Sequence, residues 1–132
     1  MKESIPLTWR KIPERYRLLG VKCNTCSAHY FPKRSVCPKC RRKGKLGEIQ
    51  YSGKGRIYSF TEITDPPAGF EEQAPYILAI IELEEGAHVA GQVVDATETD
   101  VKIGSAVEAV FRVIQRDDTE GLIHYGFKFR LV

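Results

Sequence analysis

Four cysteines constrain the possible fold of this chain more than any other feature. They form two Cys-x-x-Cys pairs, Cys23/Cys26 and Cys37/Cys40, with ten residues between the pairs, and the chain has no other cysteine. Four thiolates on two tight turns match the tetrahedral coordination of zinc. A redox dithiol needs only one pair in a βαβ setting, and a reducing compartment disfavours disulfides. We therefore predict a structural zinc site, with iron as an alternative that the sequence leaves open.

The residue after each pair bears on the geometry of the turn. Ser27 and Arg41 stand where the backbone of such a knuckle turns left-handed and where a glycine would ease the turn. A closed shell of four thiolates leaves no open position for water or substrate. The predicted metal is therefore not catalytic, and its role is to fold a module that has almost no core of its own.

The length of 132 residues allows one cored domain plus a small satellite. Hydrophobic residues make up 42% of the chain, and no apolar run approaches the roughly 20 residues that cross a bilayer. The charged N-terminal segment also lacks the apolar stretch of a signal peptide. We therefore expect a soluble, cytoplasmic protein that makes no membrane contact.

Patterning divides the chain into three parts. In a helical leader at residues 1–20, Trp9, Ile12 and Tyr16 follow helical spacing, and we expect Pro13 to open a second helical turn. A zinc ribbon at residues 21–46 follows, and the basic stretch RRKGKLGE at its end is interpreted as a linker. The remaining residues, 47–132, change to strand patterning.

Five strands are expected in the last part, at residues 53–63, 76–83, 88–94, 107–114 and 123–132. The last two alternate with a period of two. Interior glycines, Gly91 and Gly126, suit bulges or sharp bends. The predicted fold is mainly β: a short helical segment, a rubredoxin-like zinc ribbon and a five-stranded OB-fold barrel rather than an open sandwich.

Charge is unevenly distributed along the chain. Residues 1–56 hold fifteen Lys and Arg against three acids, a net +12, whereas residues 57–132 hold five against fourteen, a net −9. Either the N-terminal part meets an anionic partner, or the two parts complement each other within one molecule. The sequence leaves both interpretations open.

Motifs for catalysis are missing from the sequence. Every cysteine is committed to the predicted metal site, no Gly-x-Ser-x-Gly elbow occurs, and GKGRIYS lacks the spacing of a phosphate-binding loop. The histidines outside the ribbon fall in predicted strands. The sequence therefore favours a binding or scaffolding protein over an enzyme.

Several segments together resemble a known family. They are TWRKIPERYRLLG, a ribbon of the form G-x-x-C-x-x-C…FPxR-x-x-C-P-x-C, GKGRIYSFTEI, APYILAIIELEEG and HYGFKFRLV. The chain is similar to prokaryotic zinc-ribbon/OB-fold proteins that accompany thiolases and are acyl-CoA-associated. In archaea, this resemblance implies a non-catalytic scaffold that joins acetoacetyl-CoA thiolase to hydroxymethylglutaryl-CoA synthase in the mevalonate pathway. Ser27 departs from the glycine common in such ribbons, and no CoA-binding motif carries over residue by residue.

Two surfaces are candidates for binding. An exposed aromatic and basic patch has the composition of a partner interface; its members are Trp9, Tyr16, Lys33, Arg34, Arg41 and Arg42. The alternative is that the two aromatics fold back over the barrel. We also expect the loop from Asp65 to Pro75 to face CoA, the alternative being an ordinary connection between strands. Pro66, Pro67 and Gly69 would shape this loop, and Phe70 would pack on adenine or pantetheine.

Single-stranded nucleic-acid binding is the alternative function, because OB barrels and zinc ribbons both serve it. An aromatic stacking platform would then come from two strands; its members would be Tyr58, Phe60, Tyr125, Phe127 and Phe129. A barrel segment with a net charge of −9 would repel the phosphate backbone. Nucleic acid is therefore the less favoured partner.

Overall fold

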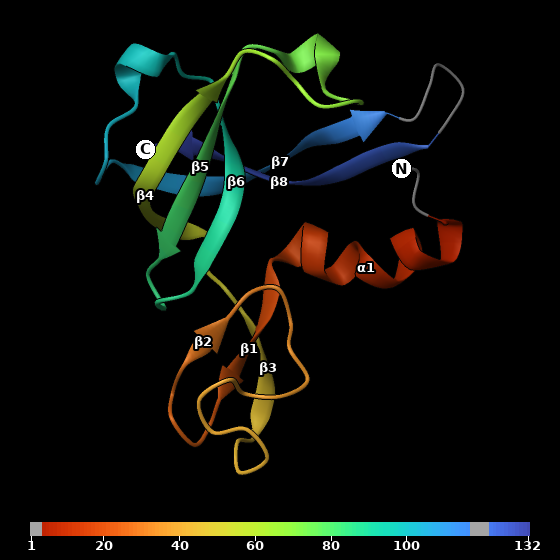
Figure 1. Cartoon of the computed structure of the whole chain (residues 1–132), viewed down its shortest axis with the longest axis vertical. Coiled ribbons are helices and arrows are strands. Elements are labelled where there is room, and N and C mark those ends of the chain that lie inside the picture. Colours follow the sequence, from red (N-terminus) through yellow and green to blue (C-terminus); the bar gives the residue numbers. More distant parts are fainter. Residues whose placement is uncertain (1–3, 117–121) are drawn as a thin grey trace.

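The computed structural model describes residues 4–116 and 122–132 of the chain. A five-stranded barrel lies at one end of an elongated molecule, a small three-stranded ribbon lies at the other, and one helix lies beside their junction (Figure 1). This arrangement confirms the mainly β fold expected from the sequence. No helix among the described residues is long and apolar enough to cross a membrane.

Helix α1 (Ile5–Arg17) begins at Ser4, whose side chain accepts a hydrogen bond from the backbone N–H of Leu7. It ends at Leu18, which has a left-handed backbone with φ of 53°. Pro13 lies inside this single helix, so the prediction that it opens a second turn is wrong. The missing N–H of Pro13 removes one hydrogen bond, while the helix continues on both sides and packs against β8.

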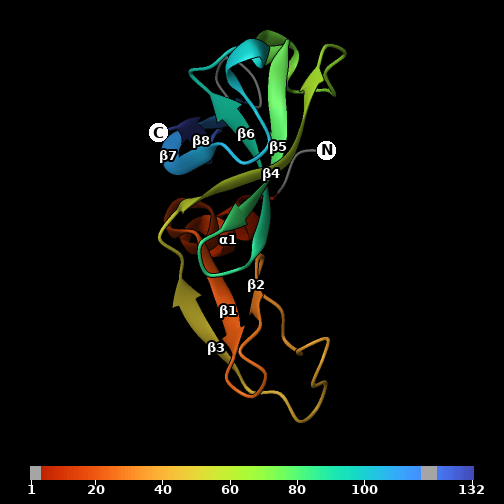
Figure 2. The ribbon, with the colours of Figure 1, turned by 90° about the vertical axis from the view of Figure 1, so that its left-hand side faces the viewer.

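The ribbon is a sheet in the order β2-β1-β3, built from β1 (Leu19–Cys23), β2 (His29–Tyr30) and β3 (Leu46–Gln50) (Figure 2). Strand β3 pairs along the whole of β1 in antiparallel register. The linker expected at residues 41–48 is therefore wrong from Leu46 onward. Pairing with β1 decides the conformation here, although the local sequence is rich in lysine and glycine.

The barrel closes in the order β4-β5-β6-β8-β7. Its strands are β4 (Lys54–Ile63), β5 (Tyr76–Leu83), β6 (His88–Val94), β7 (Ala106–Arg116) and β8 (Ile123–Leu131). Short 3₁₀ turns, η1 (Glu71–Gln73) and η2 (Glu98–Asp100), lie in the connections. Strand β6 meets β8 in parallel at only two residue pairs, whereas all other pairings are antiparallel. The five predicted strands of an OB-type barrel are confirmed.

The core follows the alternation of these strands. Phe129, Ile57 and Ile81 are essentially inaccessible to solvent. The aromatic row of β7 and β8 leaves the core where the two strands extend over α1: the rings of Phe111 and Tyr125 stack with centroids 5.4 Å apart and remain partly exposed. The period of two therefore places side chains on a face of the strand without showing whether the barrel covers that face.

The interior glycines have different roles. Gly126 lies beside a shift of register between Val113 and Gln115, as expected for a bulge. Gly91 pairs with Ala79 without any shift, so a bulge at this position was a wrong expectation. A Cβ atom at Gly91 would lie 2.6 Å from the ring of Phe129, so glycine is needed there because the ring packs directly on the strand.

Candidate metal centre and binding cleft

The four cysteines meet at the far end of the ribbon. Their Sγ atoms all lie within 4.8 Å of one another, with 3.6 Å between those of Cys26 and Cys37 and 4.0 Å between those of Cys23 and Cys40. A tetrahedral zinc with Zn–S bonds of about 2.3 Å separates its sulfurs by about 3.8 Å. All four cysteines are free thiols. The cluster therefore fits one tetrahedral metal ion, and the residues present would hold it without rearrangement.

Two matching turns position these thiols. The backbone N–H of Ser27 donates to the carbonyl of Cys23, and that of Arg41 donates to the carbonyl of Cys37, at 2.8 and 2.7 Å. Ser27 and Arg41 have φ angles of 60° and 52°. The left-handed backbone expected after each cysteine pair is therefore present, and both residues adopt it without being glycine.

The surroundings of Cys37 favour its thiolate. The backbone N–H of Cys40 points at Cys37 Sγ, and the Tyr30 hydroxyl lies 3.7 Å from the same atom. The first contact and, to a lesser extent, the second lower the pKa of Cys37 to about 6. The hydrogen bond with Cys37 in turn raises the pKa of Tyr30 to about 12. A ligand that is readily deprotonated suits a metal-thiolate site.

The residues of the predicted partner patch come from two parts of the molecule, helix α1 and the ribbon. Trp9 is 74% exposed on α1, whereas the ring of Tyr16 contacts the edge of Phe111 on the barrel at 5.0 Å. Tyr16 packs against β7 yet remains 42% exposed, so both aromatics lie at the surface.

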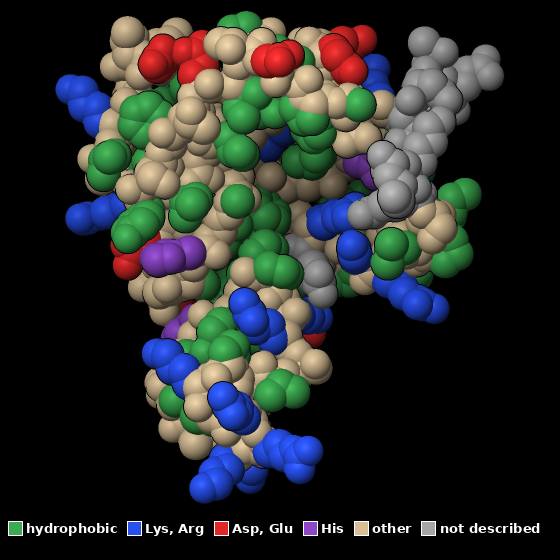
Figure 3. Space-filling model, viewed as in Figure 1, with side chains coloured by type: hydrophobic (Ala, Val, Ile, Leu, Met, Phe, Trp, Pro, Cys, Tyr) green, Lys and Arg blue, Asp and Glu red, His purple; other side chains and the backbone are tan. Residues whose placement is uncertain are grey.

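The basic members of the patch lie on the ribbon. Lys33 forms an ion pair with Glu48 at 2.6 Å, and the guanidinium of Arg34 lies 5.4 Å from the ring centroid of Tyr30. Arg41 and Arg42 are exposed beside the metal cluster. Basic side chains gather at this end of the molecule, while acidic ones gather at the opposite end of the barrel (Figure 3). The charge division of the sequence is therefore a division in space.

A cleft of about 420 Å³ opens between β6 and β8, beside the short parallel pairing of these strands. It is visible as a hollow rimmed by apolar side chains (Figure 3). Phe70 from the predicted CoA-facing loop lines this cleft, and its ring centroid lies 6.0 Å from that of Tyr76. Pro66, Pro67 and Gly69 are not among the lining residues, although Gly69 makes the turn before Phe70 with φ of 95°.

The sequence analysis missed Lys128, which lines this cleft, and its hydrogen-bond partner Gln73. Lys128 is 6% exposed, and its Nζ donates to Gln73 Oε1 at 2.8 Å. Gln73 Nε2 donates in turn to the carbonyl of Ile114 at 2.8 Å. The alternation of β8 assigns Lys128 to the outward face, but the turn η1 covers that face. The sequence pattern of β8 carries no sign of this cover.

The aromatics of the predicted nucleic-acid platform are dispersed. Phe129 is fully buried, and Phe60 and Phe127 pack against the core. Tyr58 is exposed and stacks on His88, while Tyr125 stacks on Phe111. These rings do not form one exposed surface.

Comparison with known proteins identifies the family. Residues 10–46 match the model described as ChsH2, rubredoxin-like zinc ribbon domain, and residues 48–112 match that described as ChsH2, C-terminal OB-fold domain. A "DUF35 domain-containing scaffold protein" of Methanocaldococcus jannaschii is 54% identical over 93% of this chain and 87% of its own length. The chain belongs to the ChsH2/DUF35 family. A scaffold protein of the same description from Methanothermobacter thermautotrophicus is 52% identical over 93% of this chain and 92% of its own length.

Two further proteins are similar to this chain at lower identity. A "probable enoyl-CoA hydratase alpha subunit" of Thermomonospora curvata is 27% identical over 75% of this chain and 30% of its own length. A chain of a solved structure, "Ltp2-ChsH2(DUF35) aldolase", superimposes with a TM-score of 0.70 at 24% identity, over 99% of this chain and 96% of that chain. The second likeness shows that the fold is shared.

Proposed function

We propose that this chain is a non-catalytic scaffold subunit that joins acetoacetyl-CoA thiolase to hydroxymethylglutaryl-CoA synthase in the cytoplasmic mevalonate pathway. Support comes from its archaeal relatives, which are named scaffold proteins. A family relative named as an enoyl-CoA hydratase subunit adds a link to acyl-CoA enzymes. All four cysteines take part in the cluster, so none remains as a nucleophile for acyl transfer.

The observation that carries this proposal is the separation of charge along the molecule. The ribbon end is basic and the far end of the barrel is acidic (Figure 3). Opposite charges on two ends suit two different partners, because complementary charge selects a partner and speeds its encounter. The ribbon would dock one enzyme through Arg41 and Arg42, with Lys33 and Arg34 beside them. Trp9 and Tyr16 would add a second contact from α1.

We assign the metal cluster a structural zinc, held by Cys23, Cys26, Cys37 and Cys40. Zinc would fix the two knuckles that present the basic side chains, since Arg41 directly follows Cys40. The loop of Pro66, Pro67, Gly69 and Phe70 would face a CoA thioester bound between scaffold and enzyme. Phe70 would contact it, and the position of this residue in the lining of the cleft supports this assignment.

Affinity purification of the tagged chain from its source cells, followed by mass spectrometry, tests the assembly. We expect stoichiometric recovery of a thiolase and a synthase. Charge reversal by Arg41→Glu and Arg42→Glu should lower recovery of one enzyme about tenfold, because like charges at an interface cost several kcal/mol. Reversal of two exposed barrel cations, Arg56→Glu and Lys102→Glu, is the matched control and should leave capture through the ribbon unchanged.

Recovery of ribosomal or nucleic-acid components in place of the two enzymes would overturn the proposal. Mobility-shift assays on single-stranded DNA and RNA belong in the same experiment. A shift that weakens steeply with salt would establish nucleic-acid binding instead.

A further inference from the structure

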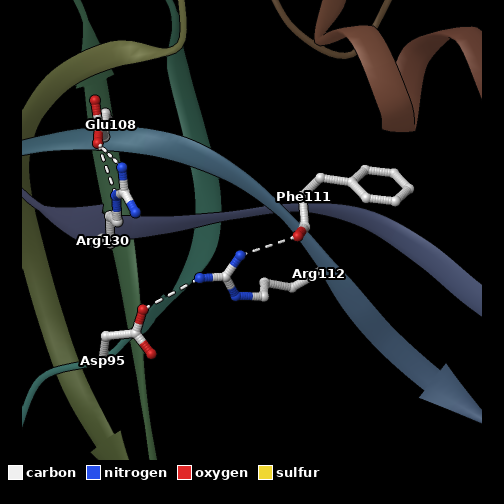
Figure 4. A network of polar contacts seen from close by, with 5 residues as sticks. All are labelled: Asp95, Glu108, Phe111, Arg112 and Arg130. Atoms are coloured by element: carbon white, nitrogen blue, oxygen red, sulfur yellow. Dashed lines mark hydrogen bonds and ion pairs between the residues drawn. The ribbon is translucent and has the colours of Figure 1, made fainter.

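No carboxylate within the described parts of the chain forms an ion pair with Lys128, unlike its neighbours. On the same pair of strands, Arg130 contacts Glu108 at 2.6 Å and Arg112 contacts Asp95 at 3.2 Å (Figure 4). The ammonium of Lys128 contacts only the neutral amide oxygen of Gln73 among the described residues. It is nevertheless the most buried of these three cations. Burial lowers the pKa of Lys128, and the charge of Arg112 adds to this effect.

A buried charge without a counter-charge costs free energy, so its presence calls for a function. Substituting an apolar residue would remove this cost. The position of Lys128 gives the functional clue, because the side chain lines the cleft between β6 and β8.

The composition of the cleft is opposite to that of the surrounding barrel. Residues 57–132 carry a net charge of −9, yet no Asp or Glu occurs among the described residues that line the cleft. The basic side chains of Arg15 and His124 line it together with Lys128. Phe70, Tyr76 and Tyr125 add aromatic surface. A volume of about 420 Å³ lies within the range of small-molecule sites, roughly 300 to 1,000 Å³.

We propose that this cleft binds a small organic anion, with its phosphate or carboxylate group on Lys128 and its apolar part against the aromatic side chains. Gln73 positions the ammonium, because its amide is itself held by the carbonyl of Ile114. This site rests on and deepens the CoA-facing part of the proposed function, because Phe70 lines the same cleft. It belongs to the isolated chain and does not depend on which enzymes the chain joins.

Binding is tested by NMR on the full-length zinc-loaded chain with two matched pairs of probes. Adenosine 5′-monophosphate and 1-naphthyl phosphate each carry the anion, and adenosine and 1-naphthol lack it. We expect both phosphates to shift the backbone amides of residues 90–92 and 124–128. Removal of the phosphate should weaken binding at least tenfold. Inorganic phosphate, which lacks an apolar part, should also bind at least tenfold more weakly.

Lys128→Met separates a binding role from a structural one. We expect this variant to lose at least tenfold in affinity for both phosphates and to melt at or above the temperature of the natural chain, because a buried charge has been removed. Lys102→Met makes the same change at an exposed position outside the cleft and should bind normally. The site is refuted if neither phosphate shifts the cleft amides, if Lys128→Met binds normally, or if Lys128→Met lowers the melting temperature. Enzyme capture has a separate readout, so the scaffold role stands or fails independently.

Discussion

At the scale of single residues, Tyr30 connects the metal cluster to the rest of the molecule. Its hydroxyl lies 3.7 Å from Cys37 Sγ, and its carbonyl accepts a hydrogen bond of 3.0 Å from the Tyr51 hydroxyl. Tyr51 is 3% exposed and also donates to the carbonyl of Val21. Tyr30 contacts the metal ligand Cys37 and also bonds to Tyr51, so only Tyr30 lies between this ligand and the barrel core. Side chains that hydrogen-bond metal ligands orient them and tune their affinity.

Tyr30→Phe should therefore weaken zinc binding while preserving the fold. A thiolate can only accept a hydrogen bond, so the Tyr30 hydroxyl is the donor to metal-bound Cys37. Its loss should raise the zinc dissociation constant by about tenfold, the lower end of the usual effect of such contacts. Competition with a chromophoric chelator measures this change.

The matched control is Tyr58→Phe, which removes the same atom from a tyrosine that stacks on His88 at the barrel surface. This control should leave the zinc affinity unchanged. An equal loss in both variants, or no loss in Tyr30→Phe, would show that the contact with Cys37 has no role in metal binding.

The turns near the cysteines were predictable, whereas the burial of Lys128 beside the cleft was not. The left-handed turns at Ser27 and Arg41 follow from the spacing of each cysteine pair, a local constraint visible in sequence. The burial of Lys128 depends on the turn η1, which lies more than fifty residues earlier in the chain and covers this side chain. Its burial is a tertiary effect, and the alternation of β8 alone assigns it to solvent.

At the scale of elements, the five barrel strands were predictable because each is an apolar or alternating run of strand length bounded by turn formers. The wrong predictions lie where contacts between elements decide the local structure. Strand β3 forms from a basic stretch because it pairs with β1, and α1 continues through Pro13 while packed against β8. Gly91 serves packing across the barrel, since the ring of Phe129 occupies the space of its missing side chain.

Gly91→Ala should accordingly destabilise the barrel. The new Cβ would lie 2.6 and 2.7 Å from two ring carbons of Phe129, which is fully buried. Overpacking of this kind costs about 1 to 3 kcal/mol in the free energy of unfolding. Urea denaturation followed by circular dichroism measures it.

Gly47→Ala, in strand β3, is the control because its new Cβ would meet only the Asn24 amide nitrogen at an ordinary 3.5 Å. We expect it to change the free energy of unfolding by less than about 0.5 kcal/mol. If Gly91→Ala were as stable as this control, the ring of Phe129 would not require a glycine on β6.

At the scale of the whole molecule, the two modules differ in what stabilises them. The barrel has a continuous core of buried side chains and a closed ladder of strands. The ribbon contributes few buried hydrophobic residues, namely Leu19, Val21 and two of the cysteines themselves. Their junction includes Tyr51, with its two hydrogen bonds to the ribbon, and the edge contact of Phe31 with Phe127 at 5.5 Å.

Removal of zinc by a chelator should therefore unfold the ribbon and leave the barrel folded. Structural zinc supplies about 10 to 16 kcal/mol of binding free energy in small metal-folded modules, far more than the few buried side chains of this ribbon can provide. Hydrogen exchange with mass spectrometry should show loss of protection in residues 19–50 and retained protection in β5 and β7. Elemental analysis before chelation should give about one zinc per chain, and added zinc should restore protection. Retained protection in the metal-free ribbon would show that zinc is not what folds it, while loss of protection throughout the chain would show that the junction at Tyr51 makes both modules unfold together.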